Sequence, residues 1–354
     1  MVFGFGTSSV LGIDIGTTSI KTVELIEEKG RIKLKNYGEY IPPSSKRELL
    51  PVETGFVSFF EEGIANIIRE VIKEAKIKAK NLVLSLPVFS SFFTLIELPL
   101  MDPKEIPAAI KFQAYQYIPV PIEEVVLNWV IIEEREALLE NKIQVLLVAV
   151  PKDIIEKYIK IVKILGFNLR ALEVESFAEV RALAREGGPI IIVNIGGRTT
   201  NVTVVENGFI RVCHNLDLSG FDLTKTLSKK MNISFERAEE FQKTKGLTKE
   251  IDTLVAPILI PVIDKIIFGV KGAINSYLSK NPQKKIQKII LSGGVGNMLG
   301  LTDYFSSKFS LKVERANPFS EILYPPVLHD VLEAIGPSFS VAVGLALREF
   351  IEKK

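Results

Sequence analysis

Two short stretches of the chain repeat the same turn, and this repeat constrains the fold more than any other feature. LGIDIGTTSI, residues 11–20, runs an apolar strand into an acid, a glycine and a cluster of hydroxyls, and IVNIGGRTTN, residues 192–201, follows a similar plan. An internal repeat of this kind predicts two similar domains that face each other across a cleft. The copies differ at one chemical position, because the first carries Asp14 where the second carries Asn194.

Composition leaves room for large cores and argues against several classes of function. The chain has 354 residues, 47% of them hydrophobic, which is enough for two or three domains. Its net charge of +2 gives no electrostatic case for nucleic acid as a partner. One cysteine and two histidines offer no disulfide and no metal-binding constellation. Prolines and charges interrupt the apolar runs well short of the ~20 residues that span a bilayer, so we expect a cytoplasmic protein.

Strand-like and helical patterns alternate along the chain, which is typical of an α/β protein. Helices are predicted at 56–76, at 223–246 and from there to about 278. The range 92–171 has its own order: strand 91–99, helix 103–118, strands 124–132 and 142–150, helix 152–166 and strand 169–174. This β-α-β-β-α-β order predicts a small inserted domain, although the last strand fits the parent sheet equally well.

The chemistry of each turn points to an anion. Gly16 permits positive φ, so the backbone N–H groups of residues 16–19 can converge on one phosphate, with Asp14 reaching a phosphate-bound Mg²⁺ through water. A simple hairpin turn explains the same residues if one motif is taken alone. The repeat favours the phosphate site, because a clamp made of two opposed hairpins requires both copies. A third turn, LSGGVGNM at 291–298, fits close approach to a nucleoside or an ordinary strand-to-helix turn.

Five motifs in order resemble the actin–Hsp70–sugar kinase ATPase fold. DIGTTSIK, EVESFAEV, NIGGRTTNV, LSGGVGNM and AIGPSFSVAVGLALR correspond to its phosphate 1, connect 1, phosphate 2, adenosine and connect 2 segments. The insert is similar to the SHS2-type α+β module of the FtsA-like branch, and most similar to that of the PilM family of type IV pilus assembly proteins. The resemblance implies a duplicated, actin-like (ribonuclease H-like) fold with a first domain at 1–91, 172–188 and 332–354, the module at 92–171, a second domain at 189–218 and 285–331, and a helical subdomain at 219–284.

The resemblance also implies a nucleotide site with ATP and Mg²⁺ as its ligands. Asp14 is expected to order the water shell of the metal, and Glu175 to hold either a water of the metal or the attacking water. Gln242 stands where relatives usually have lysine, although Lys243 is adjacent. The expected nucleotide contacts are Asp14, Gly16, Thr17, Thr18, Ser19, Lys21, Glu175, Asn194, Gly196, Gly197, Thr199, Thr200, Glu239, Gln242, Lys243, Gly293, Gly294, Gly296 and Asn297.

Asn194 decides which kind of nucleotide site we expect. An amide can hydrogen-bond the attacking water, but it cannot accept a proton from it as an acid can. We therefore expect nucleotide binding with very weak hydrolysis, and the same expectation holds if Asn194 only caps the turn. The family resemblance implies a cytoplasmic adaptor, peripheral to the inner membrane, that binds the cytoplasmic tail of a PilN-like protein. A pilus motor ATPase and a second copy of the chain are further candidate partners.

Two other functions stay open from the sequence. An active ATPase or sugar kinase of this fold needs a catalytic acid, which Asn194 argues against. An FtsA-like cell-division filament protein needs an amphipathic C-terminal helix, whereas this sequence ends in ALREFIEKK. For the partner tail we expect a groove between the inserted module and the first domain, beside residues 90–99. The alternative is a module that only spaces the domains.

Overall fold

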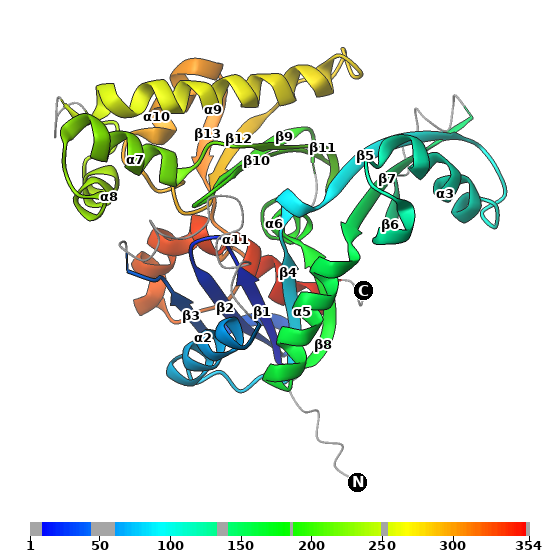
Figure 1. The fold of residues 1–354 in the computed structure, drawn as a ribbon, viewed down its shortest axis with the longest axis horizontal. Coiled ribbons are helices and arrows are strands. Elements are labelled where there is room, and N and C mark those ends of the chain that lie inside the picture. The colour runs from blue at the N-terminus through cyan, green and yellow to red at the C-terminus, as the bar shows by residue number, and fades with distance from the viewer. Residues whose placement is uncertain (1–8, 44–60, 133–140, 185–186, 249–253, 352–354) are drawn as a thin grey trace, which may run out of the picture.

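The computed structural model describes residues 9–43, 61–132, 141–184, 187–248 and 254–351. Two five-stranded sheets form the body of the molecule, and a three-stranded module lies to one side (Figure 1). The first sheet consists, in sheet order, of β3 (Arg31–Tyr40), β2 (Ile20–Glu28), β1 (Ser9–Ile15), β4 (Asn81–Leu86) and β8 (Asn168–Val174).

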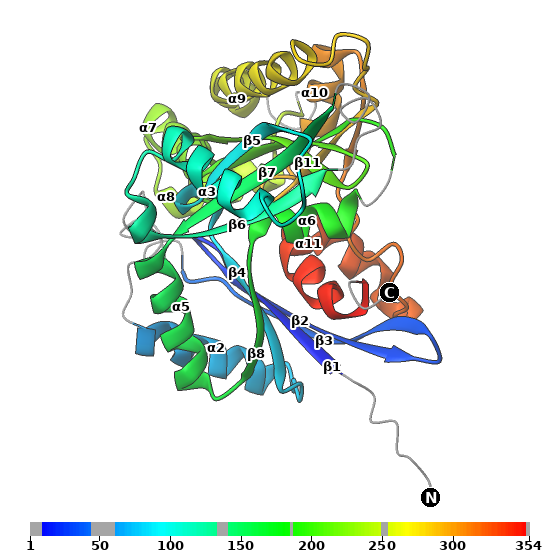
Figure 2. The same cartoon turned by 90° about the vertical axis from the view of Figure 1, so that its right-hand side faces the viewer.

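The first sheet is covered on both faces, as the continuous apolar character of its central strands requires. α11 (His329–Ile351) and α6 (Glu175–Leu183) pack on one face, and α2 (Glu61–Glu74) and α5 (Lys152–Leu165) lie together on the other (Figure 2). Gly12 lets α11 approach β1 closely, because a Cβ there would overlap the carbonyl of Ala342.

The second sheet repeats the first strand for strand. In sheet order it consists of β11 (Phe209–Leu216), β10 (Thr200–Glu206), β9 (Ile190–Ile195), β12 (Lys288–Ser292) and β13 (Lys312–Arg315). β9 pairs antiparallel with β10 and parallel with β12, as β1 does with β2 and β4. The sheet order confirms the internal repeat. α9 (Val255–Leu278) and α10 (Leu301–Phe309) pack on this half.

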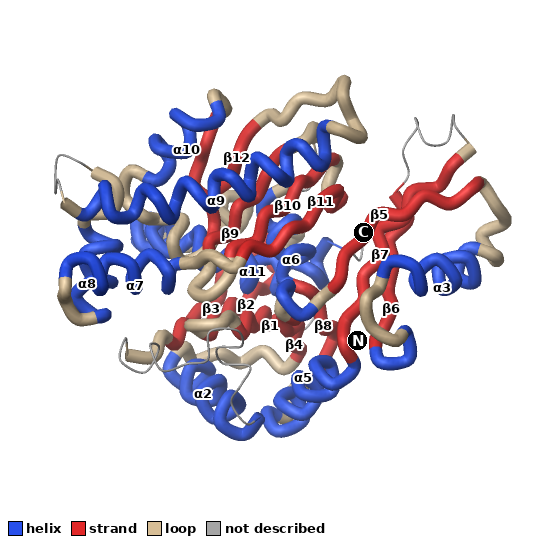
Figure 3. Tube along the Cα trace, turned by 45° about the horizontal axis from the view of Figure 1, so that its top comes forward, coloured by secondary structure: helices blue, strands red, loops and turns tan. Residues whose placement is uncertain are grey.

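The inserted module has a small antiparallel sheet of its own, which Figure 3 shows at one side of the molecule. Its order is β5 (Phe92–Pro99), β7 (Lys142–Pro151) and β6 (Val125–Ile132), and α3 (Ile106–Tyr117) packs on it. Two single turns of 3-10 helix flank these strands, η2 (Val88–Ser90) and η3 (Ile122–Glu124).

Two elements within the predicted range of the module pack with the first domain instead. β8 pairs parallel with β4, so the strand whose position was open belongs to the parent sheet. α5 buries Tyr158 and Ile161 in the same core as Ile64 of α2. β8 therefore belongs to the first sheet, and the domain boundaries stay a prediction.

Helix boundaries differ from the sequence prediction at two places. The tract 223–246 forms two helices, α7 (Gly220–Met231) and α8 (Phe235–Thr244). Asn232 ends the first with a φ of +51°, and the Ser234 hydroxyl caps the second by accepting a 3.2 Å hydrogen bond from the backbone N–H of Arg237. For the helix predicted at 56–76, residues 56–60 lie outside the described part of the chain.

One run in the described part of the chain is long and apolar enough to cross a membrane by length and composition, Pro326–Ile351. It consists of η4 (Pro326–Leu328) and α11. In this structure 67% of its apolar window is buried, with α11 packed against β1 and α6. This burial is the pattern of a core helix.

Candidate functional site

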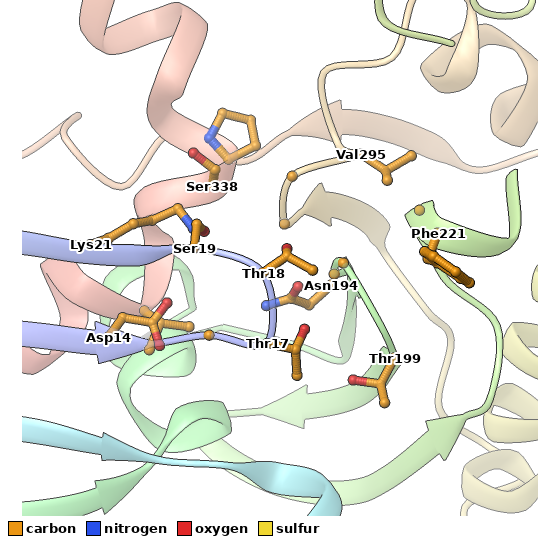
Figure 4. A pocket seen from close by; sticks show the side chains of 18 of the residues that line it. Asp14, Thr17, Thr18, Ser19, Lys21, Asn194, Thr199, Phe221, Val295 and Ser338 are labelled. Atoms are coloured by element: carbon orange, nitrogen blue, oxygen red, sulfur yellow. The ribbon is translucent and has the colours of Figure 1, made fainter. Parts of the chain in front are cut away.

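The two repeated turns face each other in a cleft between the sheets. One turn joins β1 to β2 and the other joins β9 to β10, and Figure 4 shows Thr17 and Thr18 near Asn194 and Thr199. The turns are so close that a Cβ at Gly197 would overlap the side chain of Thr18. The cleft has a volume of about 390 Å³, which is within the range of small-molecule sites.

The structure brings the expected nucleotide contacts together in this cleft, with two exceptions, Thr200 and Gly296. Thr200 is the first residue of β10, and its hydroxyl donates a 2.6 Å hydrogen bond to the carbonyl of Leu218. Gly296 is packed against the Ser292 backbone and Pro337, where a Cβ would be crowded. Both residues serve the packing behind the turns and do not line the cleft.

Asp14 supplies a buried carboxylate at the end of β1. It is 6% exposed, and its Oδ1 has no hydrogen-bond partner among the described residues. Burial raises the pKa of Asp14, and the charge of Lys21 opposes that effect. Lys21 donates a hydrogen bond to the Ser19 hydroxyl and forms an ion pair with Glu39, with 3.5 Å between Nζ and Oε1. One oxygen of Asp14 is thus left for a further ligand.

Glu175 begins α6 beside Asp14. Burial and the charge of Asp14 raise the pKa of Glu175 well above its ordinary value. A divalent cation at this point offsets the repulsion between the two acids and lowers both pKa values. No group of three or more His, Cys, Asp or Glu in the described ranges forms a metal cage. The unpaired oxygen of Asp14 and the neighbouring acid therefore fit a Mg²⁺ held through its water shell.

Glu179, one turn further along α6, is an acid that the sequence analysis missed. It is 2% exposed and accepts hydrogen bonds from Asn194 Nδ2, at 2.9 Å, and from the Ser292 hydroxyl. Burial raises the pKa of Glu179 to about 7, although both hydrogen bonds lower it. Because Asn194 and Ser292 lie on the second sheet, this carboxylate connects the two halves of the molecule. Its i,i+4 spacing from Glu175 on one helix face is the sequence signal that marks it.

Polar side chains on α7 and α8 line the far wall of the cleft. Glu239 and Lys243 form an ion pair of 2.9 Å, and Gln242 accepts a hydrogen bond from the Thr224 hydroxyl. Gln242 lines the cleft with its amide oxygen held by Thr224, and Lys243 lines it beside Glu239.

The third glycine-rich turn closes this end of the cleft. Gly293 has a φ of +80°, and a Cβ there would overlap Asn194 and Ile195. Open space surrounds the Cα of Gly294, so the backbone is exposed to a ligand there. Asn297 donates from Nδ2 to the carbonyl of Ala334, and this bond ties the turn to α11.

An apolar surface in the cleft was also missed by the sequence analysis. Phe221 and Phe235 lie with ring centroids 5.2 Å apart, and Arg198 stacks on Phe221 with 3.8 Å between its guanidinium carbon and the ring centroid. Val295 and Met298 line the cleft as well. Aromatic and aliphatic surface of this kind suits the flat face of a base.

A second hollow, of about 710 Å³, lies between the module and the second sheet. β5 forms one wall, and β11 and α9 form the other; β5 and β11 are each at the edge of their described sheets. Arg211 donates a 3.2 Å hydrogen bond to Gln144 across the hollow. Phe93 of β5 also contacts Phe177 of α6, with ring centroids 5.8 Å apart. We call this hollow the β5–β11 groove.

Comparison with known proteins identifies the family. The family model described as type IV pilus assembly protein PilM matches residues 12–350. The chain belongs to the PilM family. A relative of this PilM-family chain, the cell division protein FtsA of Neisseria meningitidis, is 28% identical over 177 residues. That match covers 44% of this chain and 41% of FtsA, so the chain spans about two fifths of the length of this curated relative.

Solved structures resemble the chain over nearly its whole length. The PilM–PilN type IV pilus biogenesis complex matches with a TM-score of 0.80 at 24% identity, covering 96% of this chain and 98% of that one. The ethanolamine utilization protein EutJ of Carboxydothermus hydrogenoformans matches with a TM-score of 0.58 at 19% identity, covering 96% of this chain and 89% of EutJ. MreB5 of Spiroplasma citri bound to ADP matches with a TM-score of 0.55 at 14% identity, covering 98% of this chain and 97% of MreB5. These likenesses confirm the actin-like fold of this PilM-family chain.

Proposed function

We propose that this PilM-family chain is a nucleotide-binding adaptor of the type IV pilus assembly platform. It binds Mg-ATP between the two turns, hydrolyses it very slowly and holds the cytoplasmic N-terminal tail of a PilN-like inner-membrane protein. The observation that carries the proposal is the close opposition of Thr18 and Gly197, which brings two phosphate-binding hairpins together beside the buried Asp14. The partner is suggested by the PilM–PilN complex, whose fold the chain shares.

Each part of the cleft suits one part of the nucleotide. The backbone N–H groups and hydroxyls of residues 16–19 and 196–199 suit the phosphates. Bound Mg²⁺ supplies positive charge against the phosphate oxygens, and Asp14 and Glu175 order its waters. Gly294 and the apolar surface around Phe221 suit the base, with Glu239 beside the ribose.

Slow hydrolysis follows from what Asn194 and Glu179 already do. A general base must accept a proton from the attacking water, and the Asn194 amide has no such capacity. Glu179 is engaged by two donors from the second sheet. Glu175 is a further acid of the cleft, and its raised pKa is the observation that favours an active ATPase as the second candidate.

The β5–β11 groove suits an extended tail. Strand edges offer backbone hydrogen-bond groups, and adding a strand to such an edge is a common mode of peptide recognition. The sequence analysis predicts a tail groove between the module and the first domain. The β5–β11 groove instead lies between the module and the second domain, and it adjoins α6 of the first domain through the contact of Phe93 with Phe177. A tail bound there touches the inserted module and the second domain. Its affinity therefore depends on how bound nucleotide positions the second domain against the module. The tail also holds the chain at the inner membrane.

A peptide-binding measurement tests the adaptor function. The probe is a synthetic peptide with the sequence of the PilN-like tail from the same organism, and fluorescence anisotropy records its affinity with and without Mg-ATP. We expect specific binding that Mg-ATP strengthens, and no binding of a scrambled peptide. Equal affinity for the native and scrambled peptides under both conditions contradicts the proposal. A motor ATPase or a second copy of the chain then becomes the partner to test.

A further inference from the structure

Two segments of the described chain each run from the nucleotide cleft to the β5–β11 groove. The first begins at η2, where Val88 and Phe89 line the cleft, and continues into β5, whose residues 93–97 line the groove. The second is β11, where Asn215 lines the cleft and residues 210–214 line the groove. The same two segments therefore form walls of both cavities.

One hydrogen bond joins the two segments beside the cleft. Asn215 donates from Nδ2 to the carbonyl of Val88, with 3.4 Å between the nitrogen and the oxygen. Asn215 lies on the second sheet, and Val88 follows β4 of the first sheet, so this bond crosses from one half of the molecule to the other. The cleft is closed here, since a Cβ at Gly197 would overlap the side chain of Thr18. At its length the bond is weak enough to break when the two halves separate.

Short-range hydrogen bonds hold η2 together as one turn. Ser91 donates from its backbone N–H to the carbonyl of Val88, at 2.9 Å, and from its hydroxyl to the carbonyl of Pro87, at 3.0 Å. The Ser90 hydroxyl also donates to the Pro87 carbonyl, at 3.1 Å. β5 begins at the next residue, Phe92, with no glycine between. A displacement of η2 is therefore passed to the start of β5, because a hydrogen-bonded turn moves as one body.

We propose that η2 is the element by which bound nucleotide regulates the β5–β11 groove, and that Asn215 is its positioning residue. Nucleotide between the two turns keeps the halves closed, and the Asn215 bond then holds η2 and the start of β5 at the distance from β11 that forms the groove. Without the bond the walls of the groove are free to separate, and the tail binds more weakly. The inference rests on the proposed function, because it requires nucleotide in the cleft and the tail in the groove.

The test measures the coupling between the two ligands in the full chain. Fluorescence anisotropy gives the affinity for the tail peptide with and without saturating Mg-ATP, and the ratio of the two affinities is the coupling factor. Asn215→Ala removes the bond, while the Val88 carbonyl keeps the N–H of Ser91 as its donor. Asn36→Ala on β3 is the matched control, because Asn36 donates a 2.8 Å hydrogen bond to Glu24 within the first sheet and lines neither cavity. Calorimetry checks that the cleft of each variant is saturated.

We expect Asn215→Ala to reduce the coupling factor about threefold, as loss of one weak hydrogen bond does, with the nucleotide-free affinity for the tail and the melting temperature unchanged. Asn215→Asp should behave in the same way, because a carboxylate cannot donate to a carbonyl. Asn36→Ala should keep the wild-type factor. A merely structural role of Asn215 lowers both affinities together and leaves their ratio unchanged.

Three results overturn the inference. If the coupling factor of Asn215→Ala equals that of the wild type, or if Mg-ATP does not change the affinity of the wild type for the tail, η2 does not regulate the groove, and the adaptor function stands. If the wild type does not bind the tail at all, both the inference and the adaptor function fail.

Discussion

The side-chain amide of Asn194 donates a 2.9 Å hydrogen bond to the carboxylate of Glu179, and this contact joins the two halves of the molecule. An aspartate at the same position has no proton to donate at neutral pH. It also brings a second negative charge against a carboxylate that is already buried. Helix α6 already supplies an acid at this place, Glu179, and that acid needs a hydrogen-bond donor. An amide at position 194 provides the donor, and an aspartate there does not.

Asn194→Asp should lower the free energy of unfolding by about 1–3 kcal/mol, since it replaces a hydrogen bond with a contact between two carboxylates. The loss is largest above neutral pH and shrinks as pH falls, because protonation of either carboxyl restores a donor. Urea unfolding at about pH 6 and about pH 8 measures both effects.

The double variant Asn194→Asp/Glu179→Gln exchanges the acid and the amide, and serves as the control. It should regain most of the lost stability and also release phosphate from ATP faster than the wild type, because the second turn then carries an acid. A double variant no more stable than the single variant means that the two side chains are not coupled.

The raised pKa of Glu179 predicts a pH-dependent stability. Its pKa rises from 4.5 to about 7 on folding, so the folded state holds the proton more tightly than the unfolded state does. Stability should fall as pH rises from about 4.5 to about 7, by about 3 kcal/mol from this group, and then level off. Urea unfolding of the wild type and Glu179→Gln across this range isolates the effect, because Asp14 and Glu175 titrate in both proteins. If the free energies of unfolding of the two proteins change in parallel with pH, the prediction is contradicted.

Asp14→Ala should weaken Mg-ATP binding by at least about tenfold, because it removes the carboxylate that orders the metal's water shell. The free protein should melt at the same temperature or higher, since the deleted group is buried with one oxygen unpaired. Calorimetry and thermal unfolding give the two quantities. Unchanged affinity for Mg-ATP would refute the metal role of Asp14.

A charge in the β5–β11 groove should prevent binding of the tail. Thr94 lies on β5 and lines the groove, so Thr94→Glu places a carboxylate where the peptide backbone docks. The matched control is Val126→Glu on β6, the opposite edge of the same small sheet, where Val126 is 45% exposed. We expect Thr94→Glu, but not Val126→Glu, to abolish the rise in fluorescence anisotropy that marks binding of the tail peptide. ATP affinity and melting temperature should be unchanged in both variants. Tail capture by a folded Thr94→Glu protein places the groove elsewhere.

Local patterns predicted the repeated architecture well, because each turn is specified by adjacent residues. The glycine of each turn and the apolar strand before it are short-range features, and the two sheets then follow from duplication. Thr200 shows the limit of this reasoning. It is adjacent to Thr199 and has a similar side chain, yet its hydroxyl bonds to Leu218 because consecutive side chains of an extended segment point in opposite directions.

Non-local packing explains what the sequence analysis missed. The helical period of α5 predicts which face is buried, but not that Tyr158 and Ile161 pack against the first domain. Glu179 was missed because its partners, Asn194 and Ser292, come from two other strands. The role of a buried acid depends on such contacts, and only the fold reveals them.

Titration of Mg-ATP into the purified protein, followed by a phosphate-release assay on the same sample, tests the central claim most directly. We predict saturable binding of one nucleotide per chain that Asp14→Asn weakens, with turnover far below the ~10 s⁻¹ typical of enzymes. Absence of binding, or turnover near that typical rate in the wild type, would contradict the account of the cleft as a slow nucleotide clamp.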